Sequence, residues 1–186
     1  MSLNKFVLVI LLASGLSACG GDPFFRRDPV LATDTIEVAA PTPANEGLPT
    51  ALDITTNGFS IAGGRFPERT EDAQRWDFAI RLEDGNLVFK PLGAFGIDSR
   101  AAITRPLGGE TFEGLEEAPP LSAFVSDSTV VIEMGAVYAA RSREPATGCS
   151  QYGKLQPLEV NVATGRVKLV VTTNGQCGDP RLVPVD

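Results

Sequence analysis

The stretch WDFAIRLEDGNLVF, residues 76–89, alternates apolar and polar side chains and turns back on itself near its centre. Trp, Phe, Ile and Leu lie on one side of residues 76–83 and Asp, Ala, Arg and Glu on the other, which is the two-residue period of a half-buried strand. Residues 84–86 (Asp-Gly-Asn) are a turn signal, and Leu87 begins a return strand. The stretch therefore predicts an antiparallel hairpin.

A second hairpin is predicted near the end of the chain. Two strand-like runs, Leu155–Val162 and Val167–Thr173, are separated by the turn signal Ala-Thr-Gly at 163–165. Cys149 and Cys177 lie equally far from this turn, so the hairpin brings them together at its open end. A structural disulfide is favoured. A metal pair or a redox pair is the alternative, but both lack support without His or a Cys-x-x-Cys spacing.

Other short runs have the same character, and Gly and Pro separate them. They are residues 59–62, 129–134 and 136–140, and residues 35–38 fit a short edge strand. No long stretch carries apolar residues every three or four positions, which argues against an all-α or α/β fold. We predict an all-β fold, either an antiparallel β-sandwich or a partly closed barrel.

The first 18 residues have the order of a secretory signal: Lys5, an apolar run at 6–12, then small residues. The run is too short to cross a bilayer, which needs about 20 residues. It ends in Leu16-Ser17-Ala18-Cys19, the pattern of a bacterial lipobox, in which the cysteine is acylated and begins the mature chain. A plain signal peptide with an incidental cysteine is the alternative. We expect cleavage after residue 18 and a lipid anchor on Cys19.

Residues 19–50 contain five prolines, and we predict a flexible Pro-rich tether there, followed by a single β-rich domain at 51–186. Gly20, rather than Asp, follows the lipidated cysteine, which favours the outer membrane in a Gram-negative host. The net charge of the chain is −7. An acidic domain is poorly suited to nucleic acid or to an anionic bilayer surface, so we expect attachment through lipid and no nucleic-acid partner.

The chain contains no His, so it lacks the commonest general base and transition-metal ligand. Ser60 in the run Gly-Phe-Ser-Ile-Ala resembles a nucleophile elbow, but the second Gly is missing. An acidic stretch lacks the alternating Asp/Asn pattern of a calcium loop and is interpreted as a solvated loop; it comprises Glu110, Glu113, Glu116 and Glu117. We therefore expect no enzymatic activity, no catalytic residue and no metal site.

Few side chains remain for ligand binding. Trp76 lies on the apolar side of its strand, so we expect it in the core. Met134, Tyr138 and Tyr152 are the remaining soft or phenolic groups, and we expect both tyrosine hydroxyls at the surface.

Several segments, in order, resemble the HmuY-type haem-binding lipoproteins. They are Trp76–Arg81, Ala94–Ile103, Phe112–Leu115 before Pro119-Pro120, Val137–Arg141 and Tyr152–Leu155. The resemblance implies an all-β, membrane-anchored protein and suggests haem as a ligand. Family members that hold haem between two histidines have no counterpart here, so no ligand residue is carried over.

Together these features predict a non-enzymatic outer-membrane lipoprotein whose β-domain binds or scaffolds another envelope component. Edge strands and the Gly-rich region 93–109 are the expected contact surfaces. The alternative is a HmuY-like carrier of a small ligand such as haem. A pocket lined by Met134, Tyr138 or Tyr152 would favour the carrier, and a filled core would favour the scaffold.

Overall fold

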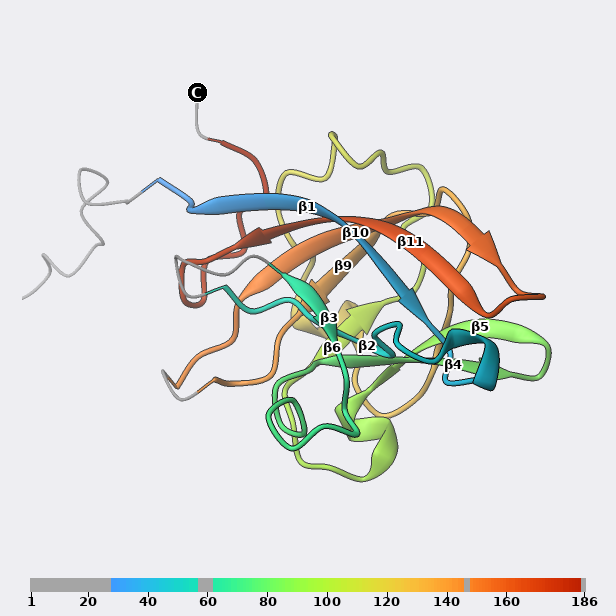
Figure 1. Ribbon diagram of the computed structural model, residues 1–186. Helices are drawn as coiled ribbons and strands as arrows, with labels where there is room; N and C mark the ends of the chain where they lie inside the picture. Colours follow the sequence, from blue (N-terminus) through green and yellow to red (C-terminus); the bar gives the residue numbers. More distant parts are fainter. Residues whose placement is uncertain (1–27, 57–61, 146–147, 185–186) are drawn as a thin grey trace, which may run out of the picture.

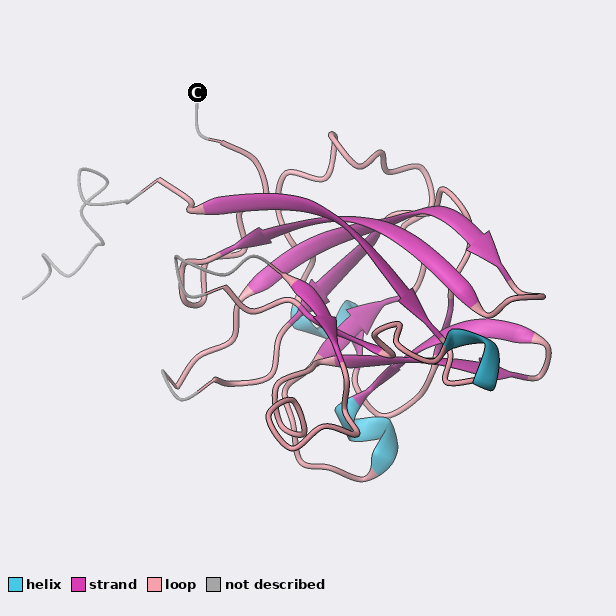
Figure 2. Ribbon diagram, in the orientation of Figure 1, coloured by secondary structure: helices cyan, strands magenta, loops and turns pink. Residues whose placement is uncertain are grey.

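Two antiparallel sheets, one above the other, make up the molecule in the computed structural model, which describes residues 28–56, 62–145 and 148–184 (Figure 1). Helical structure among these residues is limited to short 3-10 turns at Pro43–Asn45, Leu92–Phe95 and Leu121–Ala123 (Figure 2). The predicted all-β fold is confirmed. The sheets form a sandwich and do not close into a barrel. No helix in the described ranges is long and apolar enough to cross a membrane.

The larger sheet has six strands and the smaller has five. The first runs in the order β1 (Leu31–Ala39), β11 (Arg166–Asn174), β10 (Tyr152–Asn161), β9 (Tyr138–Arg141), β6 (Ala102–Thr104) and β7 (Phe124–Val125). The second runs in the order β3 (Gly63–Arg65), β2 (Ala51–Asp53), β4 (Phe78–Glu83), β5 (Asn86–Pro91) and β8 (Val130–Val131).

Both predicted hairpins form. Glu83 pairs with Asn86 across the β4–β5 turn, where Asp84 and Gly85 adopt φ angles of 50° and 77°. Two successive positive φ angles match the right-handed twist of the flanking strands. Asn161 pairs with Arg166 across the β10–β11 turn.

The open end of the β10–β11 hairpin carries the predicted disulfide. Cys149 is bonded to Cys177, with their Cα atoms 5.6 Å apart. Tyr152 and Asn174, the last paired residues of the hairpin, lie just inside this bridge. The disulfide prediction is confirmed.

Part of the segment predicted as a tether, residues 19–50, lies in the six-stranded sheet. Residues 31–39 form β1, which pairs with β11 over its whole length, from Leu31 opposite Asn174 to Ala39 opposite Arg166. The prolines of residues 41–49 belong to the connection from β1 to β2, and the Ala39 N–H donates to the Pro49 carbonyl. Between Pro29 and Pro41 the chain is free of proline, and Ile36 and Val38 reach the core. Residues 19–27 of the predicted tether and Cys19 itself lie outside the described residues.

Two of the other predicted strands are present in the structure, and a third lies mostly outside the described residues. The runs at 129–134 and 136–140 contribute β8 and β9, which belong to different sheets. Of the run at 59–62, residues 59–61 lie outside the described part of the chain.

Side chains fill the space between the sheets. Phe89 lies at the centre, edge-on to Phe78 at 6.4 Å and to Tyr138 at 5.5 Å between ring centroids. All three side chains are fully buried. Trp76 is 6% exposed, which confirms its predicted place in the core.

A second apolar cluster covers the outer face of the six-stranded sheet. It contains Phe112, Leu115, Ala118, Val137, Ala139 and Leu182. The loop that follows β6 supplies its first three members and passes above the sheet in Figure 1. Two backbone hydrogen bonds, from Leu182 to Glu116 and from Ala118 to Pro180, hold this loop to the C-terminal segment.

We expect the double substitution Cys149→Ser, Cys177→Ser to lower the free energy of unfolding by about 3–4 kcal/mol, because the bridge closes a loop of 28 residues in the unfolded chain. Urea unfolding with and without dithiothreitol measures this. The reduced wild type should match the double variant, and equal stability of the oxidised and reduced proteins would contradict the prediction.

Candidate functional site

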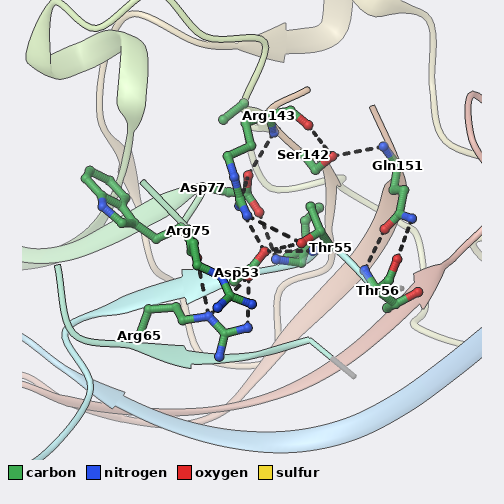
Figure 3. A network of polar contacts seen from close by, with 12 residues as sticks. Asp53, Thr55, Thr56, Arg65, Arg75, Asp77, Ser142, Arg143 and Gln151 are labelled. Carbon is green, nitrogen blue, oxygen red and sulfur yellow. Dashed lines mark hydrogen bonds and ion pairs between the residues drawn. The ribbon is translucent and has the colours of Figure 1, made fainter. Parts of the chain in front are cut away.

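A buried network of charged and polar side chains joins the two sheets at the disulfide end of the sandwich (Figure 3). Asp53 ends β2 and Asp77 directly precedes β4, so both carboxyl groups come from the five-stranded sheet. Arg143 follows β9 of the six-stranded sheet by two residues. The guanidinium therefore crosses from one sheet to the carboxylates of the other.

Arg143 donates hydrogen bonds to both carboxyl groups. Its backbone N–H and its Nη1 donate to Asp77 Oδ1 at 2.7 and 3.1 Å, and Nη1 also donates to Asp53 Oδ1 at 2.9 Å. The Ile54 N–H donates to Asp77 Oδ2 at 2.8 Å. The side chains of Asp77 and Asp53 are 0% and 2% exposed, so their charges depend on these partners instead of water.

Asp53 has further donors of its own. Arg65 donates to Asp53 Oδ2 from Nε at 3.1 Å and from Nη2 at 3.0 Å. Thr55 donates to Asp53 Oδ1 from its backbone N–H at 3.0 Å and its hydroxyl at 2.6 Å. Burial opposes the ionisation of Asp53, but hydrogen bonds from Arg143 and Thr55 and the Arg143 charge outweigh it and lower its pKa.

Asp77 differs from Asp53 because it is fully buried and has fewer donors. Burial raises the pKa of Asp77 to about 7; the Asp53 charge adds to this rise, and the Arg143 charge opposes it. Two neighbouring carboxyl groups therefore titrate in separate pH ranges.

A neutral set of hydrogen bonds continues the network between the same two sheets. The Gln151 side chain accepts from the Thr56 N–H at 2.6 Å and donates to the carbonyls of Thr56 at 2.7 Å and Gly175 at 3.0 Å. The Gln151 N–H donates to the Ser142 hydroxyl, which donates to the Arg143 carbonyl. These bonds tie the segments after β2, β9 and β11 together.

A cavity of about 840 Å³ opens beside Arg143. Its wall consists of Ala73, Gln74, Leu92, Ile97, Asp98, Ser99, Arg100, Arg143 and Glu144. This volume lies within the range of small-ligand pockets. Both arginines of the wall are already paired with carboxylates of the protein, since Arg100 Nη1 lies 2.6 Å from Glu144 Oε1. The cavity can accommodate a polar molecule, but an anion would have to displace these internal partners.

The structure does not bring Met134, Tyr138 and Tyr152 together. Met134 is 72% exposed, whereas Tyr138 is fully buried. The Tyr138 hydroxyl donates to the Val131 carbonyl and accepts from the Glu133 N–H, so its predicted surface position is wrong. Tyr152 is half-buried on the outer face of the six-stranded sheet.

The acidic stretch covers a lysine. Lys154 Nζ donates to the Leu115 carbonyl at 3.1 Å and lies 5.0 Å from the centre of the Phe112 ring. Burial lowers the pKa of Lys154, although the charges of Glu113 and Glu116 oppose this effect. No group of three His, Cys, Asp or Glu side chains in the described ranges is placed to hold a metal ion. Ser60 lies outside those ranges.

Sequence analysis missed Asp53, Asp77 and Arg143. Strand alternation assigns Asp77 to the solvated side of its strand together with Arg81, yet Asp77 is fully buried. The only available signal was a charged residue directly beside a strongly apolar strand. Nothing in the local sequence connects Asp77 to Arg143, which lies 66 residues away.

Comparisons with models of protein families, with curated proteins and with solved structures find no match to this chain.

We expect Arg143→Met to lower the free energy of unfolding by about 3–5 kcal/mol, because it leaves two buried carboxyl groups without their shared donor. The matched control is Arg100→Met, which breaks an exposed ion pair and should cost less than about 1 kcal/mol. Urea unfolding at neutral pH measures both. Equal effects of the two substitutions would contradict a structural role for Arg143.

The raised pKa of Asp77 predicts a falling stability between about pH 4 and pH 7. In this window the folded protein holds a proton that the unfolded chain has released, so each unit of rising pH removes up to about 1.4 kcal/mol of this group's contribution. Asp77→Asn should flatten that slope. The lowered pKa of Asp53 acts on the acid side instead, where stability is lost as the pH falls below 3.8. Urea titrations of both proteins from pH 4.5 to pH 7.5 measure the slopes, and parallel slopes would refute the assignment.

Proposed function

We propose that this protein is a non-catalytic bacterial lipoprotein that is anchored to the outer membrane through Cys19 and binds another envelope component through the surface of its β-sandwich. The lipobox at residues 16–19 and the disulfide between Cys149 and Cys177 support this proposal, since both belong to an exported protein.

The filled core is the observation that carries the binding part of the proposal. Phe78, Phe89 and Tyr138 occupy the space between the sheets and are fully buried. A ligand that enters the sandwich would have to displace them, at several kcal/mol each. Binding is therefore assigned to the outer surface.

The charged network supports a structural role over catalysis. Four donors converge on Asp53 from Arg65 and Thr55, and Arg143 adds a fifth. A general base or nucleophile needs access to substrate, whereas these carboxyl groups are buried and turned toward other residues of the protein. Haem binding is not proposed, because Met134, Tyr138 and Tyr152 lie in three different environments.

The anchor also sets which end of the sandwich lies nearest the membrane. The Gln176 side chain donates to the Asp28 carbonyl, so Asp28 is held at the disulfide end. Nine peptide units separate Cys19 from Asp28 and span at most about 30 Å. The disulfide end then faces the membrane, and the turns of the β4–β5 and β10–β11 hairpins point away from it.

The experiment is metabolic labelling of the full chain with a fatty-acid analogue in a Gram-negative host, followed by separation of inner and outer membranes. We expect label in the wild type and in Ser14→Ala, and the protein in the outer-membrane fraction. Cys19→Ala should lose the label and leave the membrane. Label that persists in Cys19→Ala would overturn the proposed anchor.

A further inference from the structure

One buried amide side chain holds the start of β1 against the C-terminal segment. Asn174, which is fully buried, accepts a hydrogen bond at Oδ1 from the Val30 N–H at 3.2 Å and donates from Nδ2 to the Arg181 carbonyl at 2.9 Å. Asp28 is held at the same place, because the Gln176 side chain donates to its carbonyl. The chain that precedes residue 28 therefore begins beside the C-terminal segment.

A groove of about 470 Å³ adjoins this point on the outer face of the six-stranded sheet. Residues 117–121, Tyr152 and Pro180 line it. Pro180 is the sequence neighbour of Arg181, and its carbonyl accepts a hydrogen bond from the Ala118 N–H at 2.8 Å. One wall of the groove is therefore the same C-terminal segment that lies beside the start of β1.

The strand register gives the distance from β1 to the groove. Asn174 of β11 is paired with Leu31 of β1 on one side and with Tyr152 of β10 on the other. Neighbouring strands lie about 4.8 Å apart, so Leu31 and Tyr152 are about 10 Å apart. Residues 24–27 span up to about 14 Å when extended, so they can reach across the groove from Asp28.

The groove combines an apolar surface with one acidic side. Tyr152 and three prolines supply the apolar surface, and Leu121 adds a side chain that is 58% exposed. Glu117 is exposed and lies opposite Arg181 in an isolated β-bridge. The Arg181 guanidinium is bonded to Asp179 at 2.6 Å, so its charge is matched and Glu117 makes this side of the groove acidic. Such a surface suits an occupant that carries both an apolar ring and a positive charge.

The chain itself carries such an occupant next to the groove. Residues 24–27 read Phe-Phe-Arg-Arg and directly precede Asp28. Counted back from Asp28, the two arginines come first and the two phenylalanines follow. This order matches the groove, in which the acidic Glu117 lies on the side of the C-terminal segment and Tyr152 lies further along the sheet.

We propose that residues 24–27 of this chain dock in the groove, with a phenylalanine ring against Tyr152 and the prolines and an arginine beside Glu117. The segment is covalently attached to one edge of the groove, so its effective concentration is in the millimolar range and a small contact is sufficient. Arg141 is the cross-strand neighbour of Tyr152 and repels the two arginines from the other side, which favours the same polarity.

Docking shortens the tether. Five peptide units then separate Cys19 from residue 24, and they span at most about 18 Å. An anchored domain is thereby held close to the bilayer with its disulfide end toward the lipid. This consequence rests on the proposed function, because it needs the lipid anchor, whereas the docking itself does not.

The first test is NMR spectroscopy of the mature chain, residues 19–186, carrying Cys19→Ser so that it is produced without lipid. We expect nuclear Overhauser contacts from the ring protons of Phe24 or Phe25 to the methyl groups of Leu121. The contacts should disappear in Glu117→Gln less completely than in Leu121→Ser, because the ring contributes more than the exposed ion pair.

The second test is limited digestion of the same protein with trypsin, which cleaves after Arg26 and Arg27 only while the segment is undocked. Leu121→Ser leaves both cleavage sites intact and should speed cleavage about ten-fold. The matched control is Leu158→Ser on β10, which removes a leucine that is 44% exposed outside the groove and should leave the rate unchanged. Both leucines are exposed, so neither substitution should affect the fold.

An absence of contacts between the phenylalanine rings and Leu121 would overturn the proposal, as would equal cleavage of Leu121→Ser and Leu158→Ser. Protection from trypsin that arises only when phosphatidylglycerol vesicles are added would assign residues 24–27 to the bilayer surface instead. The fatty-acid labelling of Cys19 is independent of these outcomes, so failure of the docking and failure of the anchor are distinguishable.

Discussion

One shared arginine determines how the two sheets meet. Arg143 leaves the six-stranded sheet and places its guanidinium between Asp53 and Asp77 of the five-stranded sheet, where both carboxyl groups are buried. Apolar packing between sheets is tolerant of small shifts, because methyl groups and rings make contact in many orientations. The hydrogen bonds of Arg143 to these carboxyl groups, at 2.7–3.1 Å, do not tolerate such shifts, because they depend on distance and direction. Arg143 and the two aspartates therefore specify one relative placement of the sheets.

The two ends of the sandwich are held together by different means. At the far end, the β4–β5 and β10–β11 turns are local and need few long-range contacts. At the disulfide end the segments come from distant parts of the chain. Three kinds of interaction meet there: the ion pairs of Arg143 with Asp53 and Asp77, the hydrogen bonds of Gln151, and the disulfide. Because no local turn could join these segments, side-chain chemistry does so.

The outer face of the six-stranded sheet is half covered and half open. The loop over Lys154 and the C-terminal segment bury one part beneath Phe112, Leu115 and Leu182. The acidic residues of this loop remain in solvent while its apolar residues pack, which explains why the stretch combines the two types. The open part includes a groove whose lining residues include Tyr152, Glu117 and Pro180.

The amino-acid sequence by itself determined the all-β class, the two hairpins and the cysteine pairing. The strands and hairpins depend on contacts between residues close along the chain, which the two-residue period of apolar residues indicates. The cysteine pairing follows from the equal distance of the two cysteines from a turn. Only the tertiary structure decided that residues 31–39 form a nine-residue strand, that Tyr138 buries its hydroxyl and that the Asp77 carboxyl group is buried. Each depends on a partner more than 30 residues away or on the depth of a neighbouring layer. Alternation of apolar and polar residues separates the two faces of a strand, but it does not show whether the polar face is covered by another part of the protein. The same pattern therefore fits a solvated aspartate and a buried one.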